Sequence, residues 1–352
     1  MLRQVRVFPG RLAVFMLFAL TMIVTGCSGS SDEEGPAAAP AVAPVVVYSA
    51  RAEQLIKPIF DAYTAETGVP IKYMTDAEQP LIQKLKAKGA TTSADILLTV
   101  DAGNLWYAAD QGVLRPTYSD VLESNIPSHL RDPDNEWFAM SVRARTIVYD
   151  TRKIEPSQLS GYADLADEKW RGKLCLRTSA KVYNQSLVAM MIAQMGERET
   201  EIVVRGWVDN LATSVFPNDT KLIEAIVAGQ CQVGIVNTYY FGRLQRENAD
   251  IPVAIFWPIA ETGGVHVNIS GAGVTRHARN PEGAKALLEW MSGDVGQQFL
   301  AGENLEYPAN PNVEPSPLVA AWGEFDASPM NVAKAGVFQA DAVKLMDRAD
   351  YR

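Results

Sequence analysis

Short apolar runs rich in β-branched residues alternate with stretches of helical periodicity, and this alternation constrains the fold more than any other feature. Residues 45–48, 71–74 and 94–100 have the length and composition of buried strands. Between them, residues 51–67 and 79–88 place apolar side chains at helical spacing. Strand–helix alternation of this kind predicts an α/β fold with a parallel sheet and right-handed crossovers.

A second alternating set follows residues 137–140 and 146–149, which we interpret as strands that cross between two lobes. The remaining predicted elements are strands at 173–177, 214–216, 232–236 and 267–274 and helices at 183–195, 199–212, 219–229, 239–247 and 281–291. Two α/β sets joined by strands that cross twice are typical of a two-lobed ligand trap that closes about a hinge. The ligand is then expected in the cleft between the lobes. Gly271 and Gly273, inside one predicted strand, indicate a bulge or a close backbone approach.

The first 26 residues are predicted to be a lipoprotein signal peptide. A basic start precedes the apolar run 12–24, which is shorter than the roughly 20 residues of a membrane span. Residues 24–27, Val-Thr-Gly-Cys, resemble a bacterial lipobox in which Cys27 is lipidated, and an ordinary cleaved signal peptide is the alternative. Residues 27–44 are rich in Ser, Ala, Gly and Pro, so we expect a flexible tether there.

The mature chain is acidic. Without residues 1–26 it has 29 basic and 41 acidic residues, a formal charge of −12. No basic stripe is available to neutralise phosphates, so nucleic acid is excluded as a partner.

Two cysteines remain once Cys27 is assigned to lipid. Cys175 and Cys231 each lie in or beside a predicted strand, and in an exported protein such a pair favours a disulfide. The strands must then be neighbours, because a disulfide needs Cα atoms within about 7 Å. Two buried thiols are the alternative.

The segment Asn237-Thr238-Tyr239-Tyr240 lies at the carboxyl end of the predicted strand 232–236, where ligands of open α/β sheets bind. Phenolate oxygens are hard donors that suit a trivalent metal ion. The alternative is that one tyrosine packs in a core and the other covers a surface.

Four short motifs carry a family resemblance. They are Tyr48-Ser49-Ala50-Arg51, Ser93-Ala94-Asp95, Tyr183-Asn184-Gln185-Ser186 and Asn237-Thr238-Tyr239-Tyr240. With them, residues 45–350 resemble a periplasmic ferric-iron-binding protein, the solute-binding component of an iron(III) ABC importer. The resemblance implies the type II periplasmic binding protein fold, in which each lobe is a mixed sheet flanked by helices and the ligand cleft lies between the lobes.

The resemblance also implies a set of iron ligands. Phenolates of the tyrosine-rich members fall at Tyr183, Tyr239 and Tyr240. Those members carry a histidine and a tyrosine after the Tyr-Ser-x-Arg motif, whereas this chain has Ala52 and Glu53. Glu53 is therefore the candidate for the fourth protein ligand, and water or an anion is the alternative.

Further polar residues are candidates for holding a phenolate or an anion such as carbonate. Arg243 follows Tyr240 by about one helical turn, which predicts a contact with a phenolate oxygen. The others are Arg51, Thr178, Ser179 and Asn237. For each of them, a solvent-facing polar side chain is the alternative.

We therefore predict a lipid-anchored, monomeric Fe³⁺-binding protein of a Gram-negative periplasm, which delivers iron to an inner-membrane ABC permease and its ATPase. It is not predicted to be an enzyme. The expected N-terminal lobe comprises residues 45–145 and 268–320, and the C-terminal lobe comprises 146–267 and 321–352.

One rival keeps the fold but binds an organic or oxyanion solute, with the tyrosines lining an aromatic pocket. An exported hydrolase is a second rival, although no nucleophile–base motif is present. His129, His266 and His277 are isolated, so no zinc site is predicted.

Overall fold

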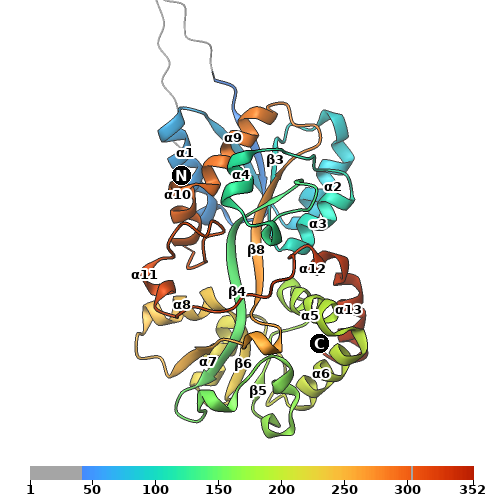
Figure 1. The fold of residues 1–352 in the computed structure, drawn as a ribbon, viewed down its shortest axis with the longest axis vertical. Helices are drawn as coiled ribbons and strands as arrows, with labels where there is room; N and C mark the ends of the chain where they lie inside the picture. The colour runs from blue at the N-terminus through green and yellow to red at the C-terminus, as the bar shows by residue number, and fades with distance from the viewer. Residues whose placement is uncertain (1–41, 303) are drawn as a thin grey trace, which may run out of the picture. The chain divides into compact units, whose positions relative to one another are not determined.

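The computed structural model describes residues 42–302 and 304–352, which form one eight-stranded mixed sheet and the helices around it (Figure 1). The strand order is β2-β1-β3-β8-β4-β6-β5, and β7 pairs with β4. The strands are β1 (Val45–Ser49), β2 (Ile71–Thr75), β3 (Ile96–Val100), β4 (Phe138–Asp150), β5 (Leu174–Cys175), β6 (Val233–Asn237), β7 (Val253–Phe256) and β8 (His266–Val274). The predicted signal peptide, Cys27 and most of the tether lie outside the described residues.

The strands at the start of the chain are parallel, as the alternation predicts, and the later ones make the sheet mixed. β1 runs parallel to β2 and β3, whereas β8 is antiparallel to β3 and β4. The helices are α1 (Glu53–Thr67), α2 (Glu78–Lys88), α3 (Ala102–Asp110), α4 (Asp120–Asn125), α5 (Val182–Met195), α6 (Glu197–Asp209), α7 (Asp219–Val227), α8 (Thr238–Glu247), α9 (Pro281–Ser292), α10 (Asp294–Gln297), α11 (Pro317–Ala320), α12 (Lys334–Val337) and α13 (Gln339–Arg348).

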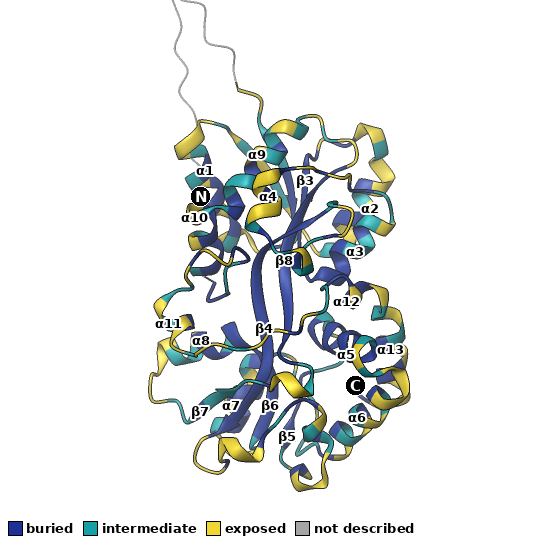
Figure 2. Ribbon diagram, viewed as in Figure 1, coloured by how far each residue is buried: buried dark blue, intermediate teal, exposed yellow. Residues whose placement is uncertain are grey.

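β4 is one continuous strand, and the prediction of two separate strands at 137–140 and 146–149 is wrong. Its first part pairs with β8, and residues 145–149 pair with β6. Arg143 and Arg145 interrupt the apolar pattern of the sequence, but both are buried and have hydrogen-bond partners. Figure 2 shows β4 and β8 buried along their length where they connect the two ends of the sheet.

Gly271 has the close backbone contact that the sequence predicts. A Cβ atom there would lie 2.7 Å from the carbonyl oxygen of Phe138 on the neighbouring strand. The β4–β8 register also shifts between Ala139 and Ser141, which is the irregularity expected beside such a glycine.

Other boundaries differ from the predictions. Residues 214–216 form no strand, and Phe216 makes only an isolated bridge to Arg177. The short strand β7 and the helices α12 and α13 were not predicted. α13 completes a core, because Leu345 and Met346 pack with the apolar residues of α5.

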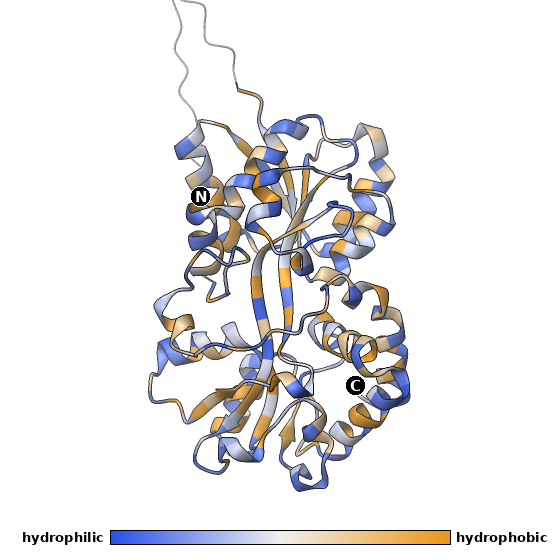
Figure 3. Ribbon diagram, viewed as in Figure 1, coloured by the Kyte–Doolittle hydropathy of each residue, from blue (hydrophilic) through white to orange (hydrophobic). Residues whose placement is uncertain are grey.

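Buried apolar residues form separate cores along the paired strands β4 and β8. Figure 3 shows the hydrophobic residues of the strands in orange. The first core joins β1 and β3 to α1, α2 and α9. In the second half of β4, Ile147 faces the core under α5, whereas Val148 faces the core under α7. This alternation follows from the two-residue period of a strand. The architecture is the predicted two-lobed one, and the exact lobe boundaries stay predictions.

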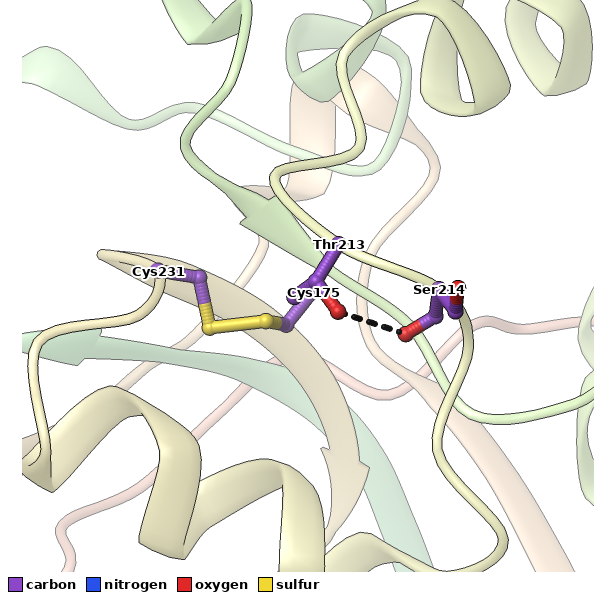
Figure 4. The surroundings of a disulfide bond; sticks show 4 residues. All are labelled: Cys175, Thr213, Ser214 and Cys231. Atoms are coloured by element: carbon purple, nitrogen blue, oxygen red, sulfur yellow. Dashed lines mark hydrogen bonds between the residues drawn. A yellow bond between two sulfur atoms is a disulfide. The ribbon is translucent and has the colours of Figure 1, made fainter.

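A disulfide joins Cys175 at the end of β5 to Cys231, which precedes β6 (Figure 4). Their Cα atoms lie 5.9 Å apart. The distance is short because β5 and β6 are adjacent parallel strands, with Leu174 opposite Val233.

Within the described residues, helices long and apolar enough to cross a membrane are absent.

Candidate functional site

Three tyrosines from two helices meet in one cavity of about 250 Å³. Tyr183 lies in the first turn of α5, and Tyr239 and Tyr240 lie in the first turn of α8, directly after β6. The ring centroids of Tyr239 and Tyr240 are 4.4 Å apart. The cavity lining also includes Ala50, Arg51, Ala52, Leu55, Glu78, Val100, Arg143, Lys181, Arg243 and Glu306.

The phenol groups of this cavity influence one another. Burial raises the pKa of Tyr239 well above its ordinary value, and the neighbouring Tyr183 and Tyr240 raise it further. Tyr239 is therefore a protonated phenol in the metal-free protein, and it loses its proton only to a strong cation.

Positive side chains surround the tyrosine rings. The guanidinium carbon of Arg243 lies 5.0 Å from the ring centroid of Tyr239, and Nζ of Lys181 lies 4.8 Å from that of Tyr183. Nη1 of Arg177 is 3.5 Å from the hydroxyl oxygen of Tyr240. The three rings therefore lie among positively charged side chains.

The cavity lining also contains a buried cluster of two arginines and one carboxylate. Nη1 of Arg51 lies 3.2 Å from Oε2 of Glu306, and Nη1 of Arg143 lies 3.6 Å from Oε1. Burial opposes ionisation of Glu306, but Arg51 and Arg143 outweigh it and lower the pKa of this carboxyl group. Ser270 accepts hydrogen bonds from both arginines.

This cluster has an excess positive charge, since two guanidinium groups face one carboxylate. The Nε atoms of Arg51 and Arg143 are buried and have no hydrogen-bond partner among the described residues. Such a wall attracts an anion.

The predicted site residues divide into three groups. Tyr183, Tyr239, Tyr240, Arg51 and Arg243 line the cavity. Asn237 lies beside it, with Nδ2 at 3.4 Å from the hydroxyl oxygen of Tyr239.

The remaining predicted residues do not line this cavity. Thr178 and Ser179 border a different cavity, together with Tyr351 and Arg352. Glu53 is exposed, and its Oε1 accepts a hydrogen bond of 3.0 Å from the hydroxyl of Tyr73. Among carboxylates, the lining instead contains Glu78 and Glu306.

Sequence reasoning missed Glu78, Arg143, Lys181 and Glu306. Arg143 carried a usable signal, because a charged residue within an apolar strand region needs a buried partner or a function. Glu306 gave no such signal, because it follows the last predicted element and approaches Arg51 only through the fold.

Histidine, cysteine and acidic side chains form no cluster of three or more that could hold a metal, as far as the described ranges extend. His266 is buried, and burial lowers its pKa to about 3. The oxygen donors in the cavity lining are therefore the three tyrosines and the carboxylates of Glu78 and Glu306.

Two α/β lobes that share long strands, together with a polar cavity lined by three tyrosines, are the architecture of a two-lobed ligand-binding protein. The family model for bacterial extracellular solute-binding proteins matches residues 59–327. The chain belongs to this family, and it is a binding protein rather than an enzyme.

Two individual relatives are named as iron uptake proteins. The chain is 38% identical to iron uptake protein A1 of Synechocystis sp. over 346 residues, which cover 95% of this chain and 96% of that protein. It is 39% identical to iron uptake protein A2 of the same organism over 314 residues, which cover 87% of this chain and 89% of the relative.

Solved structures show the same similarity. A Trichodesmium protein in complex with iron and citrate ligands superposes with a TM-score of 0.84 at 39% identity, covering 88% of this chain and 100% of the other. The ferric binding protein from Campylobacter jejuni superposes with a TM-score of 0.81 at 32% identity, with the same two coverages. The predicted family resemblance is thereby confirmed.

Proposed function

We propose that this protein binds Fe³⁺ in the cleft between its lobes, through the phenolate oxygens of Tyr183, Tyr239 and Tyr240. The observation that carries this proposal is the convergence of the three tyrosines on one cavity. The names of the Synechocystis relatives and the iron-bound Trichodesmium structure support the choice of ion.

The chemistry of the cavity agrees with a hard trivalent ion. Fe³⁺ prefers oxygen donors, and three phenolates neutralise its charge. Asn237 lies close enough to Tyr239 to hold its oxygen in place, and Arg243 lies over the ring of the same tyrosine.

The remaining coordination positions are filled from the first lobe or by an anion. Glu53 is our sequence-based candidate for a fourth protein ligand, but Glu78 of α2 lines the cavity and Glu53 does not, so we propose Glu78 ahead of it. An anion such as carbonate binds at Arg51 and Arg143, where the positive charge is in excess.

Delivery follows the family pattern. The protein carries iron through the periplasm of a Gram-negative bacterium to an ABC permease and its ATPase, as a monomer anchored by lipid at Cys27. Membrane extraction followed by mass spectrometry of the N-terminal peptide tests the lipid.

The test of iron binding is titration of the purified mature protein with ferric citrate. We expect one Fe³⁺ per chain and a visible phenolate-to-iron absorption band. Gallium(III) is the matched control, because it takes the same ligands without giving that band. A protein that takes up no ferric ion contradicts the proposal.

A second candidate function is binding of an oxyanion or an acidic organic solute without metal. The unpartnered Nε atoms of Arg51 and Arg143 favour it. Calorimetry with phosphate and citrate in the presence of a chelator separates the two functions, because only this candidate predicts tight metal-free binding.

A further inference from the structure

Arg145 lies in the middle of β4 and is 1% exposed. Its guanidinium group donates hydrogen bonds to three side chains. Nε and Nη2 bond Oδ1 of Asn184 at 3.0 and 2.6 Å, and Nη1 bonds Oδ2 of Asp219 at 3.1 Å and Oδ1 of Asn237 at 3.0 Å.

Two of these partners are close neighbours of the tyrosines in the chain. Asn184 directly follows Tyr183 in the first turn of α5. Asn237 is the last residue of β6, two residues before Tyr239, and its Nδ2 approaches the hydroxyl of that tyrosine. Arg145 therefore connects the starts of α5 and α8.

The third partner leads to Tyr240. Asp219 also faces Arg177, with Nη1 of Arg177 at 3.5 Å from Oδ1. The same Nη1 is 3.5 Å from the hydroxyl oxygen of Tyr240. Asn184 also contacts the main chain of Arg177, because its Nδ2 donates a hydrogen bond of 2.9 Å to the carbonyl oxygen of Arg177.

A buried network of charged side chains has a high desolvation cost. Arg145 and Asp219 lose their hydration when they are buried, and well-packed apolar residues often stabilise a core as well or better. Fold stability alone therefore gives a weak reason for the network. Its branches end at the segments that carry the three tyrosines, which indicates a role in the site.

We propose that Arg145 is a positioning residue that holds the three tyrosines in ligating geometry before the ion arrives. Through Asn184 and Asn237 it fixes the first turns of α5 and α8 relative to each other. The inference rests on the proposed function, since it explains how the site avoids reorganisation when Fe³⁺ binds.

The experiment compares Asn184→Ala and Asn237→Ala with the control Asn210→Ala. Asn210 is equally buried and also makes two side-chain hydrogen bonds, to the carbonyl oxygens of Leu165 and Asp167, but it contacts none of the three tyrosines. We expect about tenfold or greater loss of Fe³⁺ affinity and a shifted absorption band in the first two variants. Asn210→Ala should keep the parent's band and affinity.

Hydrogen exchange in the metal-free protein supplies a readout that does not depend on iron binding. Amides of residues 182–186 should exchange faster in Asn184→Ala than in the parent, and those of 238–241 in Asn237→Ala. If the parent takes up no Fe³⁺ while exchange changes as expected, the proposed function fails and the positioning role stands. Unchanged exchange in both variants overturns the positioning role.

Arg145→Lys provides the second measurement, because lysine keeps the charge but cannot bond three side chains in a fixed fork. It should fold and lose affinity as Asn184→Ala does. Arg145→Lys with the parent's affinity and absorption band overturns the proposal.

Discussion

The hydroxyl of Ser186 donates a hydrogen bond of 2.5 Å to Oδ2 of Asp101, and this bond joins a helix of the second lobe to the first. Asp101 has a positive φ of 81°, a strained conformation for a residue with a side chain. The main-chain N–H of Gly103 and Nδ2 of Asn268 complete its partners. Ser186 lies about one turn after Tyr183, so this contact couples the tyrosine helix to the opposite lobe.

We therefore expect Ser186→Ala to release iron about fivefold faster, because a bond of about 1 kcal/mol that joins the lobes is lost. Chelator competition measures the rate. Ser292→Ala is the control, since Ser292 is equally buried and its hydroxyl bonds within one lobe. Equal release rates in the two variants would show that the Asp101 contact does not restrain the lobes.

Replacing each cavity tyrosine by phenylalanine should weaken Fe³⁺ binding and bleach the visible band while the fold is retained. The ring packing persists and only the oxygen donor is removed. Spectrophotometric titration of the Tyr183, Tyr239 and Tyr240 variants measures the effect. Tyr63→Phe is the control, because Tyr63 is buried in the first core away from the cavity. Parent-like binding in both Tyr239→Phe and Tyr240→Phe would refute the ligand assignment.

Iron affinity should fall as pH falls. Burial and neighbouring tyrosines hold the pKa of Tyr239 above its ordinary value, so its proton must be displaced at every pH below that value. Each displaced proton lowers the apparent affinity about tenfold per pH unit of acidification. Competition titrations at neutral and mildly acidic pH measure this slope, and a flat profile excludes phenolate ligation.

Glu53 and Glu78 can be separated as candidates for the ligand from the first lobe. Glu78 lines the cavity, whereas Glu53 is bonded to Tyr73. We expect Glu78→Gln to lower iron affinity and reduce iron-driven compaction in small-angle scattering, and Glu53→Gln to bind as the parent does. The reverse result would assign the ligand to Glu53, and two parent-like variants would leave the position to an anion or water.

The disulfide should stabilise the folded protein without changing its affinity for iron. Cys175 and Cys231 are 56 residues apart in the chain, and loop entropy gives such a bridge about 4 kcal/mol. The Cys175→Ser, Cys231→Ser double variant should lose up to that much free energy of unfolding in urea while keeping iron affinity. Equal unfolding curves for the oxidised parent and the double variant would contradict this.

The sequence alone predicts the parts of the molecule that local patterns specify. Short β-branched apolar runs identified β1 and β3, and helical spacing of apolar residues identified α1 and α5, to within a few residues. Tyr239 and Tyr240 were found because they follow the end of the strand β6, and the disulfide because two cysteines of an exported chain favour pairing.

Tertiary structure alone decided which side chains share the cavity. Glu306 meets Arg51 across 255 positions of the chain, and no local pattern encodes such a contact. The sequence predicted two strands in place of β4, because Arg143 and Arg145 interrupt its apolar pattern. A buried charge within a strand needs a partner, and here residues distant in the sequence supply it. Glu53 was expected in the site from its place after a motif, but the direction of a side chain at a helix start depends on its neighbours, here Tyr73 on β2.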